Sequence, residues 1–189
     1  KWNEVGASFG FIDCVYEIGD WLWGGLRVEK DKNKGFGYIK KAAEAGLYKA
    51  QKDLADIFLE DEDLADFEEA YKWYYKCAEH GDARCINKLG VMNVLAFGVP
   101  QNFSKARKLF EKAAEKKTDV GDGEAEYNLG VLFEYGYGVA INYSKAAKWY
   151  LRSCEHAHDN SHARKKMIRL QERGLYDGDI PHDSFIYPC

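Results

Sequence analysis

Residues 125–157 read AEYNLGVLFEYGYGVAINYSKAAKWYLRSCEHA, and the stretch holds two helical patterns separated by a glycine turn. In the first pattern, Leu129, Leu132 and Phe133 are apolar at the spacing of one helix face. In the second, apolar side chains again recur at helical spacing, while lysines and an arginine occupy the opposite face. Asn142 stands where a side chain can cap the second helix. The stretch therefore predicts a helix, a turn and a helix.

The turn glycines Gly136 and Gly138 raise the alternative of a phosphate-binding loop. Such a loop follows a strand and presents backbone amides at the start of a helix. Here a helical pattern precedes the glycines, so the requirement for a strand is not met. We interpret the glycines as turn residues, with Gly130 allowing two helices to approach closely.

Three earlier segments, 14–46, 50–81 and 85–117, repeat this organisation. Anchored on the equivalent residues Ile18, Leu54, Leu89 and Leu129, the repeats lie 36, 35 and 40 residues apart. Asp31 and Asn102 occupy the cap position of Asn142. A period of this size is typical of solenoids, in which helix pairs stack on one another.

The predicted fold is all-α: an α/α solenoid of about four helix-turn-helix repeats with a terminal capping helix. The expected repeats are about 7–46, 47–81, 82–117 and 123–157, and the capping helix is 162–174. Residues 1–174 would form the solenoid, and residues 175–189 a tail outside the repeats.

Residues 127–150 carry a Leu-Gly pair, a Gly-x-Gly-Val turn, a Ser-Lys-Ala step and a Trp-Tyr pair. In these features the chain resembles the Sel1-like repeat family, which is related to tetratricopeptide repeats, over roughly residues 14–170. The second repeat departs from the pattern because acidic residues replace its glycine turn. The resemblance implies a noncatalytic scaffold or adaptor that binds another protein or peptide on a concave face of the first helices.

By analogy with tetratricopeptide repeats, residues flanking each Leu-Gly pair should face that groove. The positions are Asp13, Tyr16, Asp20, Trp23, Lys49, Lys52, Asp56, Arg84, Asn87, Val91, Val94, Glu124, Tyr127, Val131 and Glu134. Within this set, Lys49, Lys52, Arg84 and Asn87 would form a basic and amide patch. We expect that patch to receive an acidic segment or a chain terminus, the alternative being ordinary solubilising residues.

The composition excludes two classes of partner. A formal net charge of -4 gives no basic footprint for nucleic acid. No uncharged run approaches the roughly 20 residues of a membrane-spanning helix. The start, Lys1-Trp2-Asn3-Glu4, lacks the apolar region of a signal peptide, but it is not methionine, so upstream sequence can have been removed. A cytoplasmic location is slightly favoured over a periplasmic or secreted one.

The cysteines allow two interpretations. Cys77 and Cys85 are eight residues apart across a turn between helices, which could bring them within disulfide reach. The secreted, cysteine-rich branch of the family uses bridges of similar separation, although here the pair is shifted by one position. Cys14, Cys77, Cys85 and Cys154 also fall at small-residue core positions of the repeat. We therefore expect buried thiols, with a disulfide as the alternative.

Two groups of residues resemble metal ligands. They are Cys154, His156, His158 and His162, and in the tail Asp177, Asp179, His182 and Asp183. Their spacing matches no familiar zinc site, and Cys154 is expected in the core, so we expect neither metal nor cofactor. No Ser/His/Asp or Cys/His arrangement can be assembled by spacing, so no catalytic residue is predicted.

Asn102-Phe103-Ser104 and Asn142-Tyr143-Ser144 both satisfy the N-glycosylation sequon. Both asparagines also fall at a helix cap, where the repeat itself prefers Asn or Asp. The cap alone accounts for these asparagines unless the chain enters a secretory pathway.

The function predicted first is the noncatalytic interaction scaffold. An alternative is a bacterial inhibitor or immunity protein that occludes a toxin or effector, and a third is a weak hydrolase or small-molecule binder. Fold alone does not choose among them, since function depends on sites and partners. The sequence leaves the oligomeric state open.

Overall fold

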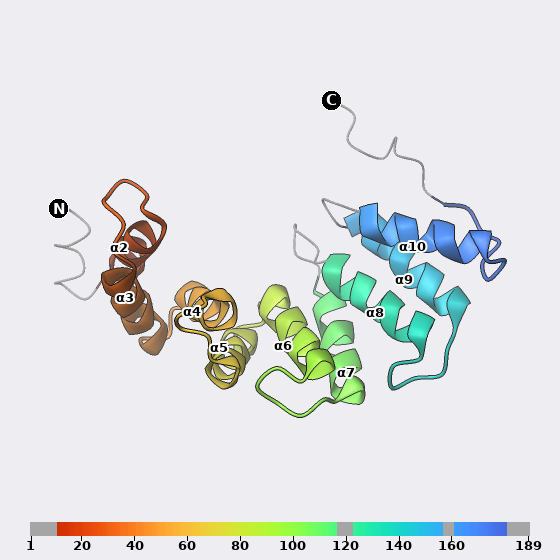
Figure 1. The fold of residues 1–189 in the computed structure, drawn as a ribbon, viewed down its shortest axis with the longest axis horizontal. Helices are drawn as coiled ribbons and strands as arrows, with labels where there is room; N and C mark the ends of the chain where they lie inside the picture. Colours follow the sequence, from red (N-terminus) through yellow and green to blue (C-terminus); the bar gives the residue numbers. More distant parts are fainter. Residues whose placement is uncertain (1–10, 117–122, 157–160, 181–189) are drawn as a thin grey trace. The chain divides into compact units, whose positions relative to one another are not determined.

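The computed structural model describes residues 11–116, 123–156 and 161–180. Within these ranges the chain forms nine helices and no strand (Figure 1). The all-α class predicted from the spacing of apolar residues is confirmed.

The helices belong to two compact units. The first unit comprises residues 1–85 and 97–99, and the second comprises 86–96 and 100–189. The first unit contains α2 (Ile12–Gly24), α3 (Lys32–Glu44), α4 (Tyr48–Glu60) and α5 (Phe67–Glu79). The second contains α7 (Phe103–Ala114), α8 (Gly123–Tyr135), α9 (Tyr143–His156) and α10 (Ser161–Glu172). The remaining helix, α6 (Ala83–Leu95), begins in the first unit and continues in the second.

Each helix pair lies inside one of the four predicted repeat ranges. The capping helix α10 begins one residue before its predicted start, and residues 181–189 of the tail lie outside the described residues. The two compact units divide the chain within α6, a division that the repeat pattern did not predict.

Side-chain caps start the second helix of every repeat. Asp31 accepts a hydrogen bond from the backbone N–H of Lys34 at 3.0 Å, and Asp66 accepts from two backbone N–H groups in α5. Asn102 and Asn142 do the same for α7 and α9. Each cap satisfies a backbone donor that the helix leaves unpaired, which confirms the caps predicted at Asp31, Asn102 and Asn142.

The glycines of the last repeat have structural roles. Gly136 and Gly138 have φ values of 73° and 67°, a conformation that side-chain-bearing residues rarely adopt. Gly130 lies against the ring of Tyr150, where an added Cβ would come within 2.4 Å of Cε1. The turn and the close approach therefore both require glycine, as the sequence predicted.

Each unit has its own apolar core. In the first unit, the fully or nearly fully buried side chains include Val15, Ile39, Leu54 and Tyr74. In the second, Tyr150, Met167 and Leu170 pack in one cluster that joins α9 to α10. Figure 1 shows α8, α9 and α10 stacked in sequence order, so that α10 covers α9. This supports the expectation that α10 caps the repeats.

Candidate functional site

The first unit has an open hollow of about 390 Å³ bordered by α2, α3 and α4. Its lining is rich in carboxylates. The lining residues are Asp20, Trp23, Lys32, Ile39, Asp53, Asp56, Ile57, Glu60 and Asp61. Three of them, Asp20, Trp23 and Asp56, belong to the first-helix face predicted to meet a partner.

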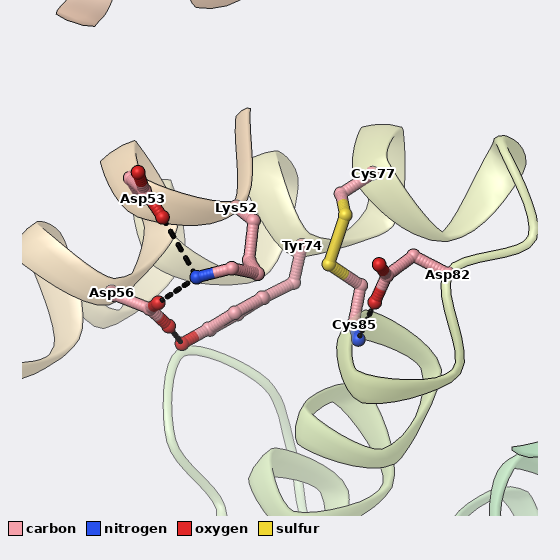
Figure 2. Close-up of a disulfide and its surroundings, with 7 residues drawn as sticks. All are labelled: Lys52, Asp53, Asp56, Tyr74, Cys77, Asp82 and Cys85. Carbon is pink, nitrogen blue, oxygen red and sulfur yellow. Dashed lines mark hydrogen bonds and ion pairs between the residues drawn. A yellow bond between two sulfur atoms is a disulfide. The ribbon is translucent and has the colours of Figure 1, made fainter. Parts of the chain in front are cut away.

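Lys52 is paired within the chain to two of the lining carboxylates. Its ammonium group lies 2.7 Å from an oxygen of Asp53 and 2.9 Å from an oxygen of Asp56, as Figure 2 shows. Burial lowers the pKa of Lys52, but its hydrogen bonds to Asp53 and Asp56 outweigh burial and raise it. Lys52 therefore stays charged, and its charge is neutralised by its own helix.

Two tyrosines from other helices hold the same carboxylates. The hydroxyl of Tyr16 on α2 donates to Asp53 at 2.6 Å, and the hydroxyl of Tyr74 on α5 donates to Asp56. Burial and these hydrogen bonds raise the pKa of both tyrosines, so their hydroxyls remain protonated donors. Three helices thus fix the orientation of the carboxylates of α4.

The remaining carboxylates leave the hollow negative. Asp61 pairs with Lys32 at 2.6 Å, and the Lys32 ammonium lies 5.2 Å from the centre of the Trp23 ring. Among the described residues, Asp20 and Glu60 have no cationic partner. Burial, followed by the charge of Asp53, raises the pKa of Asp20. The lining of the hollow thus has five carboxylates and one ammonium group, that of Lys32, while Lys52 pairs with two of these carboxylates.

These contacts correct the basic and amide patch expected from the sequence. Lys52 offers no free positive charge, because Asp53 and Asp56 bind it. Asn87 lies in the second unit, is 1% exposed, and interacts there with Glu124 and Asn128. Lys49 and Arg84 are exposed on α4 and α6. The lining of the hollow in the first unit is predominantly negative, and Lys49 and Arg84 lie outside that lining.

Asp53, Glu60 and Tyr74 were not among the site residues predicted from the sequence. Asp53, Asp56 and Glu60 are spaced three and four residues apart, which places carboxylates on one side of a helix. That spacing was the available signal. The pairing of Tyr74 with Asp56 had no signal, because it depends on the packing of α5 against α4.

In the second unit, two buried carboxylates form hydrogen bonds and ion pairs between helices. Glu134 is 4% exposed, accepts a hydrogen bond from Tyr150 at 2.5 Å, and pairs with Lys166 of α10 at 3.1 Å. Glu126 is 2% exposed and pairs with Arg152 and His156 of α9. Glu134 was expected to face a partner, but it joins α8 to α9 and α10.

Four other predicted face residues of the second unit are intermediate between core and surface. Val91 and Val94 pack against the cluster around Phe110, while Tyr127 and Val131 pack against the cluster around Tyr150. Glu124 is exposed and accepts a hydrogen bond from Asn87 at 3.1 Å. In the first unit, Asp13 is exposed at the start of α2. A role of these residues in binding stays a prediction.

A disulfide joins Cys77, in the last turn of α5, to Cys85, in the first turn of α6 (Figure 2). The Cα atoms are 6.0 Å apart, and both residues are fully buried. The expectation of free thiols was therefore wrong for this pair, because the turn between α5 and α6 brings two core positions together. Cys154 is a buried thiol that forms no disulfide with another described cysteine, and burial raises its pKa to about 11. Cys14 is free but only partly buried.

The two suspected metal-ligand groups are only partly within the described residues. His156 contacts Glu126 at 2.9 Å, and His158, His182 and Asp183 lie outside the described residues. In the described part of the chain, Cys77, Asp82 and Cys85 come close enough to share a metal ion. The sulfur atoms of Cys77 and Cys85 are bonded to each other, however, so neither cysteine is a thiolate ligand.

Every helix in the described ranges is too short or too polar to cross a membrane.

A chain built from successive capped helix pairs is an α/α repeat protein of the tetratricopeptide type. The Sel1 repeat family model matches residues 12–47, 49–82, 83–117 and 123–158. The chain belongs to the Sel1 repeat family, as its Leu-Gly, Gly-x-Gly-Val and Trp-Tyr steps indicated. Sel1 repeat proteins generally serve as protein–protein interaction scaffolds, and the fold is typically noncatalytic.

Solved structures resemble the chain over most of its length. A Sel1 repeat protein from Oxalobacter formigenes superimposes with a TM-score of 0.76 at 27% identity, covering 86% of this chain and 64% of that one. The protective antigen c5321 of uropathogenic Escherichia coli superimposes with a TM-score of 0.61 at 23% identity, covering 92% of this chain and 44% of that one. The second likeness concerns the fold alone.

Two curated relatives match shorter segments. DAP3-binding cell death enhancer 1 of Rattus norvegicus is 29% identical over 90 residues, which are 48% of this chain and 18% of the relative. The chitin synthase regulator SKT5 of Saccharomyces cerevisiae is 44% identical over 62 residues, which are 32% of this chain and 9% of the relative. The chain therefore spans less than a fifth of the length of either relative.

Proposed function

We propose that this protein is a noncatalytic scaffold that binds a segment of a partner protein at the carboxylate-lined hollow of its first unit. The observation that carries the proposal is this hollow, whose lining brings Trp23 and Asp20 of α2 together with four carboxylates of residues 53–61. Trp is a common anchor of protein interfaces, and a preformed concavity lowers the cost of ordering at binding.

The charge of the hollow favours a basic partner segment. Asp20 and Glu60 lack a cationic partner among the described residues, and burial and the charge of Asp53 raise the pKa of Asp20, so its ionised form is less favourable there than in water. An incoming Lys or Arg would relieve the repulsion between Asp20 and Asp53. The Trp23 ring already accepts the ammonium of Lys32 at 5.2 Å, so the same ring suits a cationic side chain.

The relatives are consistent with a binding role. One is named for binding DAP3, and the other is named as a regulator of chitin synthase. Both are matched over a small part of their length, so neither supplies a partner for this chain. Their support is limited to the idea that such repeats act on other proteins.

The proposal can be tested by selecting random 12-residue peptides displayed on phage against the full chain. We expect the selected peptides to be enriched in Lys and Arg. Selection against an Asp20→Asn/Glu60→Gln variant should lose this enrichment, because the two unpaired charges are gone. A Glu44→Gln/Glu79→Gln variant is the matched control, since it removes two exposed carboxylates outside the lining. Enrichment of acidic peptides, or equal enrichment on both variants, would contradict the proposal.

A further inference from the structure

Asn102 and Asn142 each use one side of their amide group to cap a helix. Their Oδ1 atoms accept hydrogen bonds from the backbone N–H groups of Lys105 and Lys145, both at 2.9 Å. Within a side-chain amide, only the oxygen can accept a hydrogen bond from a backbone N–H, so the orientation of each amide group is fixed. The Nδ2 atom of each asparagine therefore points away from the backbone donor that its oxygen caps.

Both sequons are accessible in the structure. Asn102 and Ser104 are exposed, Asn142 is half-buried and Ser144 is exposed. Helix capping does not require the serines, because Asp31 and Asp66 cap α3 and α5 and are followed two residues later by Asn33 and Glu68. Ser104 and Ser144 also begin the Ser-Lys-Ala step that the third and fourth repeats share. Helix capping requires Asn or Asp at the first position and leaves the third position free.

An exposed aromatic surface lies beside both asparagines. The ring of Phe103, which follows Asn102, stacks on Tyr137 at 5.2 Å, and Tyr137 stacks on Tyr135 at 5.7 Å. Tyr135 and Tyr137 are 46% and 40% exposed, and Ile141, which precedes Asn142, is 56% exposed. The two sequons therefore lie beside exposed apolar side chains of the second unit.

The disulfide between Cys77 and Cys85 provides an independent indication of the compartment. Disulfides form and persist in oxidising compartments and are rare in reducing ones. N-linked glycans are added to sequons of chains that enter the secretory pathway. The disulfide therefore supports maturation of the chain in the kind of compartment in which N-glycans are added.

We propose that Asn102 and Asn142 are N-glycosylation sites that are modified when the chain enters an oxidising secretory compartment. The donor is a lipid-linked oligosaccharide pyrophosphate. The bond between C1 of the first sugar and the pyrophosphate oxygen breaks, a bond between C1 and Nδ2 forms, the amide nitrogen loses one proton, and the lipid pyrophosphate leaves. The amide oxygen is unchanged, so each helix keeps its cap. The glycans then cover the patch formed by Phe103, Tyr135, Tyr137 and Ile141.

The test is to express the full chain behind a cleavable secretion signal in insect cells. Chains that have lost the signal are collected from both the cells and the medium. Their intact mass is measured before and after treatment with an amidase that releases N-glycans. We expect two glycans on the wild-type chain and conversion of both asparagines to aspartate on release. Ser104→Ala and Ser144→Ala should each remove one glycan, and the double variant should remove both.

The serine variants keep both asparagine caps, so loss of a glycan cannot be ascribed to loss of the helix start. Asn102→Asp and Asn142→Asp provide a second check, because Asp also caps a helix but cannot be glycosylated. When made without glycosylation in bacteria, all four single variants should melt close to the wild type. A processed chain with unmodified mass overturns the proposal, and modification of one site alone overturns it for the other.

Discussion

Replacement of Gly130 by Ala tests the close helix approach that defines the last repeat. The added Cβ would lie 2.4 Å and 2.5 Å from Cε1 and Cδ1 of Tyr150. The ring has little room to move, because Tyr150 is fully buried and its hydroxyl donates a hydrogen bond to Glu134 at 2.5 Å. Overpacking of this kind costs about 1–3 kcal/mol. This cost opposes the gain of up to about 1 kcal/mol that Ala brings to a helix interior.

Gly37→Ala in α3 is the matched control. Gly37 is exposed, and a Cβ added there would meet no atom within 4 Å. This variant should therefore gain about 0.5–1 kcal/mol from helix propensity. Urea unfolding followed by far-ultraviolet circular dichroism should place Gly130→Ala below the wild type and Gly37→Ala above it. Equal midpoints for the two variants would refute the packing argument.

Three further predictions concern other features of the fold. Cys77→Ala/Cys85→Ala should lower the free energy of unfolding by about 2–3 kcal/mol, and reductant should shift the midpoint of the wild type but not of the variant. Ala96→Gly should raise thermal stability by about 1 kcal/mol, since Ala96 has a φ of 60° that glycine adopts without strain; an unchanged melting temperature would contradict this. Burial and the charge of Asp53 raise the pKa of Asp20, so the stability associated with protonated Asp20 is present at acidic pH and lost as pH rises through the raised pKa. Asp20→Asn should therefore increase stability at pH 7 and reduce the fall in stability above about pH 4, measured by urea unfolding across pH.

Local sequence signals predicted the fold well. The apolar spacing of residues such as Leu129 and Leu132 depends only on the helix period, and the caps at Asn102 and Asn142 depend on contacts within three residues. The close approach at Gly130 followed from the repeat, because a helix pair needs a small residue where two helices touch. Such features are readable because their physical causes lie within one repeat.

The site residues were harder to predict, because their surroundings come from distant segments. Lys52 looked like a free cation, yet Asp53 and Asp56 bind it while tyrosines of α2 and α5 hold those carboxylates. Glu134 looked like a surface carboxylate, but Lys166, in the helix that follows the last complete repeat, reaches it. Pairings of this kind depend on tertiary packing, and the spacing within one helix does not reveal them.

The most direct test of the proposed function is a charge exchange at the hollow. A fluorescently labelled peptide chosen by the wild-type chain is titrated with the wild type and with Asp20→Lys/Glu60→Lys, and its affinity is measured by anisotropy. We expect the variant to bind the basic peptide at least about tenfold more weakly, a change of about 1.4 kcal/mol. A second peptide carries Glu in place of each Lys and Arg. The variant should bind this acidic peptide more tightly than the wild type does. Unchanged affinity for both peptides would contradict the claim that the hollow of the first unit recognises a basic segment.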